Sequence, residues 1–249
     1  MSRLRRFIAA GAVLMLAGSA AVGCTIDQGD GSEKSSESTQ EAQPEPATIS
    51  VEDGAEGVGP LDPITVTSSD GLESVTMTNE DGKEVEAEFN ADKTEWKVAE
   101  PLGYSRQYTI EATTTKGETS QASFSTVVPN GQISAYIGPL DGSEVGVAHA
   151  VNFYFDSSPA NRQAAQDAIT IETSNDTEGA FYWIDPNHLV WRPKEFWQPG
   201  TEVTVSSDIY GKDLGDGIYG AQDSKASFTI GDEVKTVVDD NTKMLTVYH

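Results

Sequence analysis

The chain has 249 residues, of which 37% are hydrophobic, so its length allows one or two folded domains with modest cores. Acidic residues outnumber basic residues 40 to 16, which gives a formal net charge of −24. This excess excludes nucleic acid as a partner, because no basic stripe is present that could displace counterions from phosphates. We expect a monomer with an acidic exterior.

The first 23 residues have the features of an export signal. Arg3, Arg5 and Arg6 precede an apolar run that begins at Phe7, and small residues lead from it to Cys24. The apolar run of about eleven residues is too short for a bilayer span, which needs roughly 20. We therefore predict a signal peptide at 1–23 and export to the outer face of the cytoplasmic membrane, in the cell envelope.

Cys24 is the only cysteine, so the mature protein has no internal disulfide. Its position after Ala21, Val22 and Gly23 resembles a bacterial lipobox, in which the thiol carries a diacylglyceryl group. We predict that Cys24 is lipidated and anchors the protein in the membrane. The alternative is a free thiol on a secreted protein that an ordinary signal peptidase has cleaved.

Residues 24–47 are predicted to form a disordered acidic linker. They are rich in Ser, Glu, Gln and Pro, and they contain no aromatic residue. Such a segment cannot bury enough apolar surface to offset the entropy lost on ordering. Behind a lipid anchor, it would hold the next domain away from the membrane.

From residue 48 the sequence predicts short β-strands. Apolar and polar residues alternate at 64–66, 75–77, 85–89, 96–98, 108–112 and 122–124, and turn sequences at 79–82 and 90–93 separate some of these runs. Six or seven short strands with no helical stretch predict an immunoglobulin-like β-sandwich at 48–130. The disulfide of true immunoglobulin domains is missing, so the name applies to the architecture only.

Residues 131–232 repeat this plan, which indicates a second, duplicated immunoglobulin-like domain. Trp96 precedes Tyr108 by twelve residues, and Trp191 precedes Val203 by the same interval. The sequence Asp-Gly at 53–54 and 141–142 begins each copy, and the run at 121–124 is echoed at 225–228. The fold class is therefore predicted to be all-β, with two tandem β-sandwiches.

The second copy carries two insertions. One is the Gly-rich loop 210–220, and the other covers 158–168. In the latter, Ser158 is placed to cap a helix, Pro159 suits its first turn, and alanines follow, so we predict a short helix.

The last segment, 233–249, is predicted to be a β-hairpin, because two alternating runs flank the polar residues 239–242. A lone hairpin is at best marginally stable in water. Both modules already have a full set of strands, so we expect this hairpin to begin a third domain whose remainder is not in this sequence.

Residues suited to catalysis are few. A nucleophile needs a neighbouring base that a third group orients, but the only thiol is Cys24 and the only histidines are His149, His188 and His249. We expect His188 in a hairpin turn and His149 in a loop or strand edge, both as solvent-facing polar residues. No catalytic residue is predicted.

Metal and cofactor sites are not predicted either. Asp213 and Asp216 lie in a Gly-rich loop that could hold calcium, but the ligand series of an EF-hand is absent. No pair of histidines or cysteines has metal-ligand spacing. The Gly-rich loop also lacks the dinucleotide-binding pattern.

The densest aromatic group consists of Tyr182, Trp183, Trp191, Phe196 and Trp197. Trp191 corresponds to Trp96 of the first copy, and we expect both rings to fill the space between two sheets. Trp197, beside the turn at 199–200, is expected to be partly exposed, where it could meet a partner domain or a glycan.

The order of motifs resembles the L,D-transpeptidases of actinobacterial cell walls over 50–249. The motifs are EPLGY at 100–104, PLDGSEVGV at 139–147, VWRP at 190–193 with FW at 196–197 and PGT at 199–201, YG at 210–211 with DLGDG at 213–217, FTIGDEV at 228–234 and DDNTK at 239–243. In that family, two immunoglobulin-like modules precede a catalytic β-domain. The resemblance implies that 233–249 is the start of this domain.

The resemblance also implies an activity. In the family, a cysteine in a Ser-His-Gly-Cys motif attacks a peptidoglycan stem peptide, forms a thioester and passes the acyl group to a neighbouring diaminopimelate amine. This sequence has no such motif and no cysteine after residue 24, so no catalytic residue can be carried over and the chain is predicted to be inactive.

Two hypotheses follow for the function. In the first, the chain is the anchored stalk of a peptidoglycan L,D-transpeptidase, whose stem-peptide substrates contact the missing catalytic domain. In the second, it is a non-enzymatic envelope lipoprotein whose immunoglobulin-like modules bind wall polymer or a protein partner.

Overall fold

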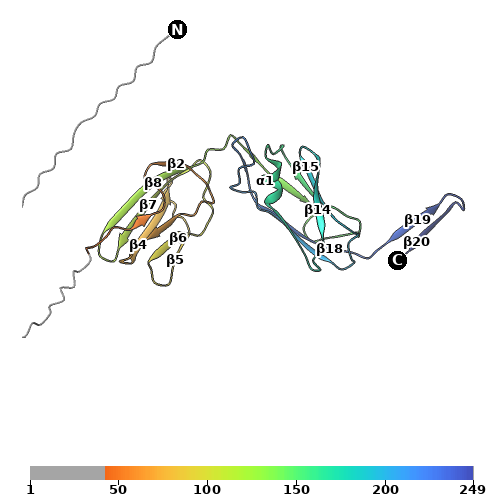
Figure 1. Cartoon of the computed structure of the whole chain (residues 1–249), viewed down its shortest axis with the longest axis horizontal. Coiled ribbons are helices and arrows are strands. Elements are labelled where there is room, and N and C mark those ends of the chain that lie inside the picture. Colours follow the sequence, from red (N-terminus) through yellow and green to blue (C-terminus); the bar gives the residue numbers. More distant parts are fainter. Residues whose placement is uncertain (1–42, 249) are drawn as a thin grey trace, which may run out of the picture. The chain divides into compact units, whose positions relative to one another are not determined.

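The computed structural model describes residues 43–248 (Figure 1). The expected signal peptide, Cys24 and the expected linker up to residue 42 lie outside the described residues, as does His249. The described part is β-structure apart from one short helix, which confirms the all-β fold class. Within 43–248, no helix has the length and apolar character needed to cross a bilayer.

The first module is a sandwich of two four-stranded sheets, ordered β1-β3-β6-β5 and β2-β8-β7-β4. Alternating burial along β7 places Tyr108, Ile110 and Ala112 in the space between the sheets, as the sequence predicts. The strands are β1 (Thr48–Ile49), β2 (Ala55–Val58), β3 (Thr65–Thr67), β4 (Leu72–Asn79), β5 (Ala87–Phe89), β6 (Glu95–Val98), β7 (Gln107–Thr114) and β8 (Thr119–Thr126).

The second module repeats these two sheets as β10-β12-β15-β14 and β11-β18-β16-β13. A separate parallel pair joins β9 to β17. The strands are β9 (Gly131–Ile133), β10 (Ala135–Gly138), β11 (Ser143–Val145), β12 (Val151–Phe155), β13 (Ile169–Thr173), β14 (Gly179–Asp185), β15 (His188–Pro193), β16 (Glu202–Ser207), β17 (Ile218–Gly220) and β18 (Ser224–Ile230).

The repeated Asp-Gly sequence has the same role in both modules. Asp53 accepts the N–H of Ser123 through its carboxylate at 2.9 Å, and Asp141 accepts that of Ser227 at 2.8 Å. The following glycine has a positive φ in each copy, and its N–H donates to the carbonyl of the same serine at 2.7 Å. Each Asp-Gly turn thus starts a strand that pairs in parallel with the last strand of its module.

The two tryptophans that the sequence aligns also occupy matching positions. Trp96 on β6 pairs with Val66, and Trp191 on β15 pairs with Val151. Both rings are buried, with 3% and 6% of their surface exposed. The prediction that each fills the space between two sheets is confirmed.

The predicted helix is present but begins later than expected. It is α1 (Arg162–Asp167), and its N-cap is Asn161, whose side-chain oxygen accepts the N–H of Ala164 at 3.1 Å. Ser158 does not cap it, because its hydroxyl instead donates to the carbonyl of Pro186. Asn161 is favoured at this position because its short side chain reaches the free N–H groups of the first turn.

The end of the expected linker belongs to the first module. Ala47 is 7% exposed and packs in the core of that module. Its carbonyl accepts the hydroxyl of Ser120 at 2.6 Å, and the N–H of Glu45 donates to Asp70. A small apolar side chain with a satisfied carbonyl can be buried without an unpaired polar group, so this module starts before residue 48.

The C-terminal hairpin is present as β19 (Lys235–Asp239) and β20 (Met244–Tyr248), joined by 240–243 (Figure 1). It forms a two-stranded sheet of its own and adds no strand to the four-stranded sheets. Every residue of both strands is exposed. The hairpin is thus not an integral strand pair of the second sandwich.

Candidate functional site

The residues suited to catalysis are not brought together in the described part of the chain. His188 begins β15, and its Nε2 lies 2.9 Å from the side-chain oxygen of Asn152, while its ring stacks on Tyr154 with centroids 4.2 Å apart. His149 lies in an exposed loop, where its carbonyl accepts the indole N–H of Trp197. Neither histidine forms part of a nucleophile, base and orienting-group arrangement, which nucleophilic catalysis requires.

The two aspartates of the Gly-rich loop stabilise the loop itself. The Asp213 carboxylate accepts a hydrogen bond from the N–H of Gly215 at 2.8 Å. Asp216 has a positive φ, and its backbone carbonyl accepts a hydrogen bond from the side-chain N–H of Asn130. Among residues 43–248, no three His, Cys, Asp or Glu side chains are gathered as a metal site would need.

The expectation that Trp197 is exposed is wrong. Its side chain is only 2% exposed and packs against Trp191, with ring centroids 5.3 Å apart. Its indole N–H donates to the carbonyl of His149 at 2.7 Å, so the ring can be buried with its one polar atom paired. The adjacent Phe196 is the exposed ring, at 73%.

An aromatic surface covers the outer face of the β10-β12-β15-β14 sheet. Tyr136 pairs with Tyr154 across β10 and β12, and Tyr154 pairs with His188 across β12 and β15. The three tyrosines of this face, Tyr136, Tyr154 and Tyr182, are 58%, 49% and 70% exposed. Exposed aromatic rings beside polar groups are typical of surfaces that meet a partner or a sugar.

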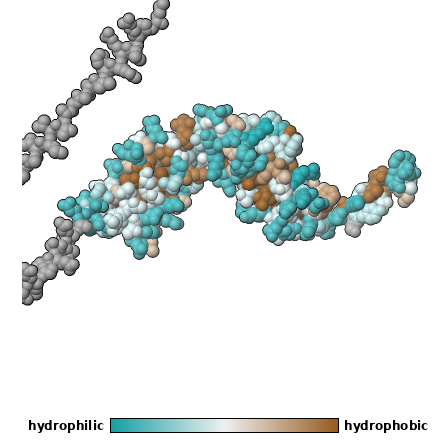
Figure 2. All heavy atoms as spheres, in the orientation of Figure 1, coloured by the Kyte–Doolittle hydropathy of each residue, from teal (hydrophilic) through white to brown (hydrophobic). Residues whose placement is uncertain are grey.

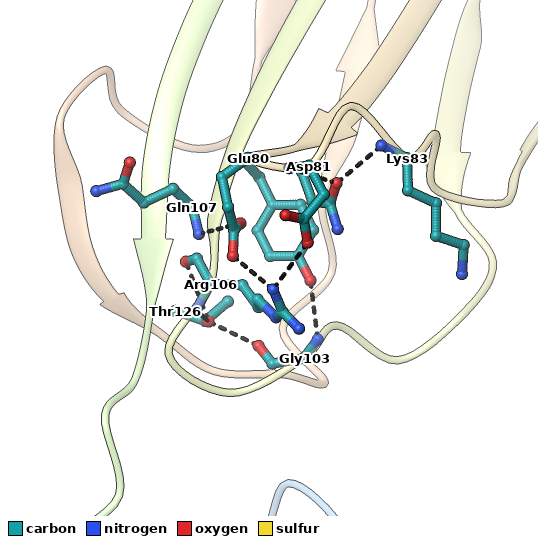
Figure 3. A network of polar contacts seen from close by, with 9 residues as sticks. Glu80, Asp81, Lys83, Gly103, Arg106, Gln107 and Thr126 are labelled. Carbon is teal, nitrogen blue, oxygen red and sulfur yellow. Dashed lines mark hydrogen bonds and ion pairs between the residues drawn. The ribbon is translucent and has the colours of Figure 1, made fainter.

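A polar network fixes the loop before β7 in the first module (Figure 3). Arg106 donates to Glu80 at 2.7 Å and to Asp81 at 3.1 Å, and the bond from Arg106 lowers the pKa of Glu80. On the other side of the loop, Thr126 donates its hydroxyl to the carbonyl of Gly103 at 2.7 Å. The N–H of Gly103 donates to the hydroxyl of Tyr108 at 2.9 Å.

This loop carries Tyr104, which contacts the second module. Its hydroxyl donates to the carbonyl of Gly220 at 2.7 Å and accepts the N–H of Gly211 at 2.8 Å. Its ring lies against those of Tyr210 and Tyr219, with centroids 5.0 and 5.7 Å away. We call Tyr104, Tyr210 and Tyr219 the tyrosine cluster.

The tyrosine cluster also forms a hydrogen bond that is donated by the second module to the first. The Tyr210 hydroxyl donates to the carbonyl of Leu102 in the first module at 2.7 Å. Burial raises the pKa of Tyr104 to about 12 and also raises that of Tyr210. Both hydroxyls are therefore protonated at neutral pH, as their donor roles require.

Sequence reasoning did not single out the tyrosine cluster. Tyr104 and Tyr210 stand in two of the motifs that carry the family resemblance, and each lies next to a glycine. A glycine next to an aromatic residue in a loop permits a close approach of backbone from elsewhere. The glycine beside each tyrosine therefore indicates that other backbone can approach, but it does not identify which residues do so.

The hairpin presents an apolar face to solvent. Val238 pairs with Leu245, and Thr236 pairs with Val247, so the four side chains share one face. Val238, Leu245 and Val247 are 69%, 62% and 46% exposed, and apolar residues mark the hairpin surface in Figure 2. A contiguous exposed apolar patch is typical of a surface that another part of a protein covers.

Comparisons with known proteins agree with the resemblance that the motifs indicate. A family model described as a bacterial Ig domain matches residues 55–213. The chain is 45% identical over 204 residues to L,D-transpeptidase 2 of Mycobacterium tuberculosis (strain CDC 1551 / Oshkosh), covering 80% of this chain and 50% of the relative. It is 36% identical over 203 residues to L,D-transpeptidase 5 of Mycobacterium tuberculosis (strain ATCC 25618 / H37Rv), covering 77% and 45%.

Among solved structures, an L,D-transpeptidase in complex with imipenem matches with 28% identity and a TM-score of 0.37, over 48% of each chain. The chain spans about half the length of the curated relatives it matches. The resemblance to L,D-transpeptidases that the motifs indicate is confirmed by those relatives. Since the family model covers more than half of its residues, the chain belongs to the bacterial Ig domain family.

Proposed function

We propose that this chain is the membrane-anchored, immunoglobulin-like stalk of a peptidoglycan L,D-transpeptidase, and that the catalytic domain follows the hairpin in a longer protein. The observation that carries the proposal is the exposed apolar face of β19 and β20. The chain that bears this face matches only about half the length of its L,D-transpeptidase relative. A two-stranded hairpin gains independent stability only by packing against further structure. A following domain would supply that structure.

The proposed division of labour places all the chemistry in the following domain. There a cysteine would attack the stem peptide, form a thioester and transfer the acyl group to a diaminopimelate amine of a neighbouring strand. The described residues contribute no nucleophile to this reaction, since 43–248 contain no cysteine. Their part is to position the domain at a distance from the lipid on Cys24.

The catalytic part of the proposal is tested on the product of the complete locus. The coding region beyond residue 249 should continue in frame to a Ser-His-Gly-Cys motif. The purified product should then gain the mass of one carbapenem, and a variant with serine in place of that cysteine should not. Absence of an adduct on the intact product would refute the proposal.

The present chain provides the matched control. We expect residues 25–249 to form no carbapenem adduct and to show no cross-linking of stem peptides. Cross-linking by this fragment would contradict the assignment of all the chemistry to the following domain.

The anchor is tested separately at the N-terminus. The mature protein should begin at Cys24 with the added mass of a lipid, and Cys24→Ser should move the protein from the membrane fraction to the soluble fraction. An unmodified thiol on the mature protein would show that it is secreted without an anchor.

A second candidate function is binding of wall polymer or a protein partner by the modules themselves, and the aromatic surface of Tyr136, Tyr154 and Tyr182 favours it. Here the purified chain should sediment with insoluble cell-wall polymer. Tyr136→Ala combined with Tyr154→Ala should reduce the bound fraction several-fold, whereas Phe89→Ala, an exposed ring in the first module, should not.

A further inference from the structure

Only a short connection lies between the two modules. The N–H of Val127 donates to the carbonyl of Val58, and the carbonyl of Val127 accepts the N–H of Ser105, both at 3.0 Å. Asn130 is bonded to the second module, through its N–H to Gly217 and through its side chain to Asp216, both at 2.9 Å. Val128 and Pro129 are left between these bonded residues, and the proline ring restricts its own φ.

Contacts beyond this connection join the same two modules. The tyrosine cluster contributes three hydrogen bonds, two at the Tyr104 hydroxyl and one at the Tyr210 hydroxyl. Leu61 of the first module lies so close to Gly211 that a Cβ added there would be 2.5 Å from its Cγ. Gly211 also has a φ of +73°, so both its backbone and its lack of a side chain suit this approach.

Both halves of the contact are supported from within their own modules. In the second module, the inserted loop is held by Ile209 and Leu214, which are fully buried in its core. The N–H of Leu214 donates to Ile218, and that of Gly220 donates to Lys212. Tyr210 and Gly220 therefore belong to a loop that is ordered by packing and by backbone hydrogen bonds.

In the first module, the network of Figure 3 holds Gly103 and Arg106, which lie on either side of Tyr104 in the sequence. Gly103 is held by Thr126 and Tyr108, and Arg106 is held by Glu80 and Asp81. Ser105 between them has a φ of +55°, a conformation that costs energy in a residue with a side chain. The surrounding hydrogen bonds offset this cost and direct Tyr104 towards the second module.

We propose that the tyrosine cluster is a clasp that holds the two modules as one rigid body, and that the inserted loop 210–220 supplies half of it. The insertion thus has a mechanical role, because it supplies the second module's side of the contact. The Arg106, Glu80 and Asp81 network acts on the clasp indirectly, by positioning Tyr104. The inference is independent of the proposed function, because it concerns only the two modules.

The test is a measurement of relative module motion in solution. Residual dipolar couplings of backbone amides are collected for both modules in the full chain, carrying Cys24→Ser so that no lipid is attached. If the modules are one rigid body, a single alignment tensor fits the couplings of both. We expect this for the protein with its clasp intact.

Two variants remove the hydroxyl bonds while keeping the rings. Tyr104→Phe loses the bonds to Gly220 and Gly211, and Tyr210→Phe loses the bond to Leu102. In each variant, the couplings of the two modules should require separate tensors, and the tensor of one module should fall in magnitude. Unchanged amide shifts in both cores would show that each module remains folded.

Tyr182→Phe is the matched control, since Tyr182 is 70% exposed and lies outside the clasp; it should keep a single tensor. Separate tensors in the parent protein would overturn the inference. So would a single tensor that persists in both Tyr104→Phe and Tyr210→Phe with folded modules.

Discussion

Adjacent residues of one turn can differ completely in burial, as Phe196 and Trp197 do. Phe196 is 73% exposed and Trp197 is 2% exposed, although both precede the same Pro-Gly turn. What distinguishes them is the pairing of the indole N–H with the carbonyl of His149 and the packing of the indole against Trp191. Burial here is decided by contacts with residues far along the chain.

This pair gives a stability prediction at the residue scale. Trp197→Ala removes a large buried ring and should lower the free energy of unfolding by about 3–5 kcal/mol. Phe196→Ala should change it by less than about 0.5 kcal/mol, because an exposed side chain loses few contacts. Urea unfolding of both variants measures the difference, and equal effects would contradict the assigned burial of Trp197.

The glycine of the repeated Asp-Gly turn allows a second residue-scale test. A Cβ would meet no atom within 4 Å at either Gly142 or Gly146, but only Gly142 has a positive φ, of +72°. Gly142→Ala should therefore cost about 1–2 kcal/mol through backbone strain alone. Gly146→Ala should be neutral or slightly stabilising, because it restricts the unfolded chain. A similar cost for both variants in thermal unfolding would exclude strain as the cause.

At the scale of elements, alternation in the sequence predicted the strands well. The positions of Tyr108, Ile110 and Ala112 on β7 are buried as expected, because a period of two selects one face of a sheet. Alternation does not select which residues meet across the molecule. The bond between Tyr210 and Leu102 joins positions 108 residues apart, and no local pattern encodes that pairing.

The errors at this scale have the same origin. The local sequence favours Ser158 as the cap of α1, but the helix starts further along the chain and the Asn161 side chain caps it. The turn beside Trp197 favours an exposed ring, although contacts with Trp191 and His149 bury it. Local sequence suggests a residue's conformation, and tertiary contacts then decide its surroundings.

The hairpin gives a prediction at the element scale. If β19 and β20 are not part of the second sandwich, replacing their apolar face should leave the modules unaffected. Val238→Ser combined with Leu245→Ser should change the free energy of unfolding of the modules by less than about 0.5 kcal/mol in this chain. Val205→Ser, on the fully buried face of β16, is the control and should be strongly destabilising. A large loss from the hairpin variant would show that the hairpin packs on a module.

At the scale of the whole molecule, charge limits how two modules can touch. Acids outnumber bases 40 to 16, so a contact made of charged side chains would bring like charges together. The clasp avoids this, because phenol groups and backbone carbonyl and N–H groups form its hydrogen bonds. An uncharged contact of this kind suits a strongly acidic protein, and it stays intact only while the phenols are protonated.

Alkaline pH should therefore open the clasp. The pKa of Tyr104 is about 12 in the folded protein against an ordinary value of 10.0, so the unfolded or opened chain ionises first. The stabilisation from Tyr104 is fully present below pH 10 and is lost as the pH rises to about 12.

Other groups titrate in this range, so the quantity to measure is the difference in urea midpoint between the parent protein and Tyr104→Phe. That difference should shrink from pH 10 upwards, whereas Tyr182→Phe should follow the parent protein throughout. A constant difference between the parent protein and Tyr104→Phe across this range would mean that ionisation of Tyr104 does not open the clasp.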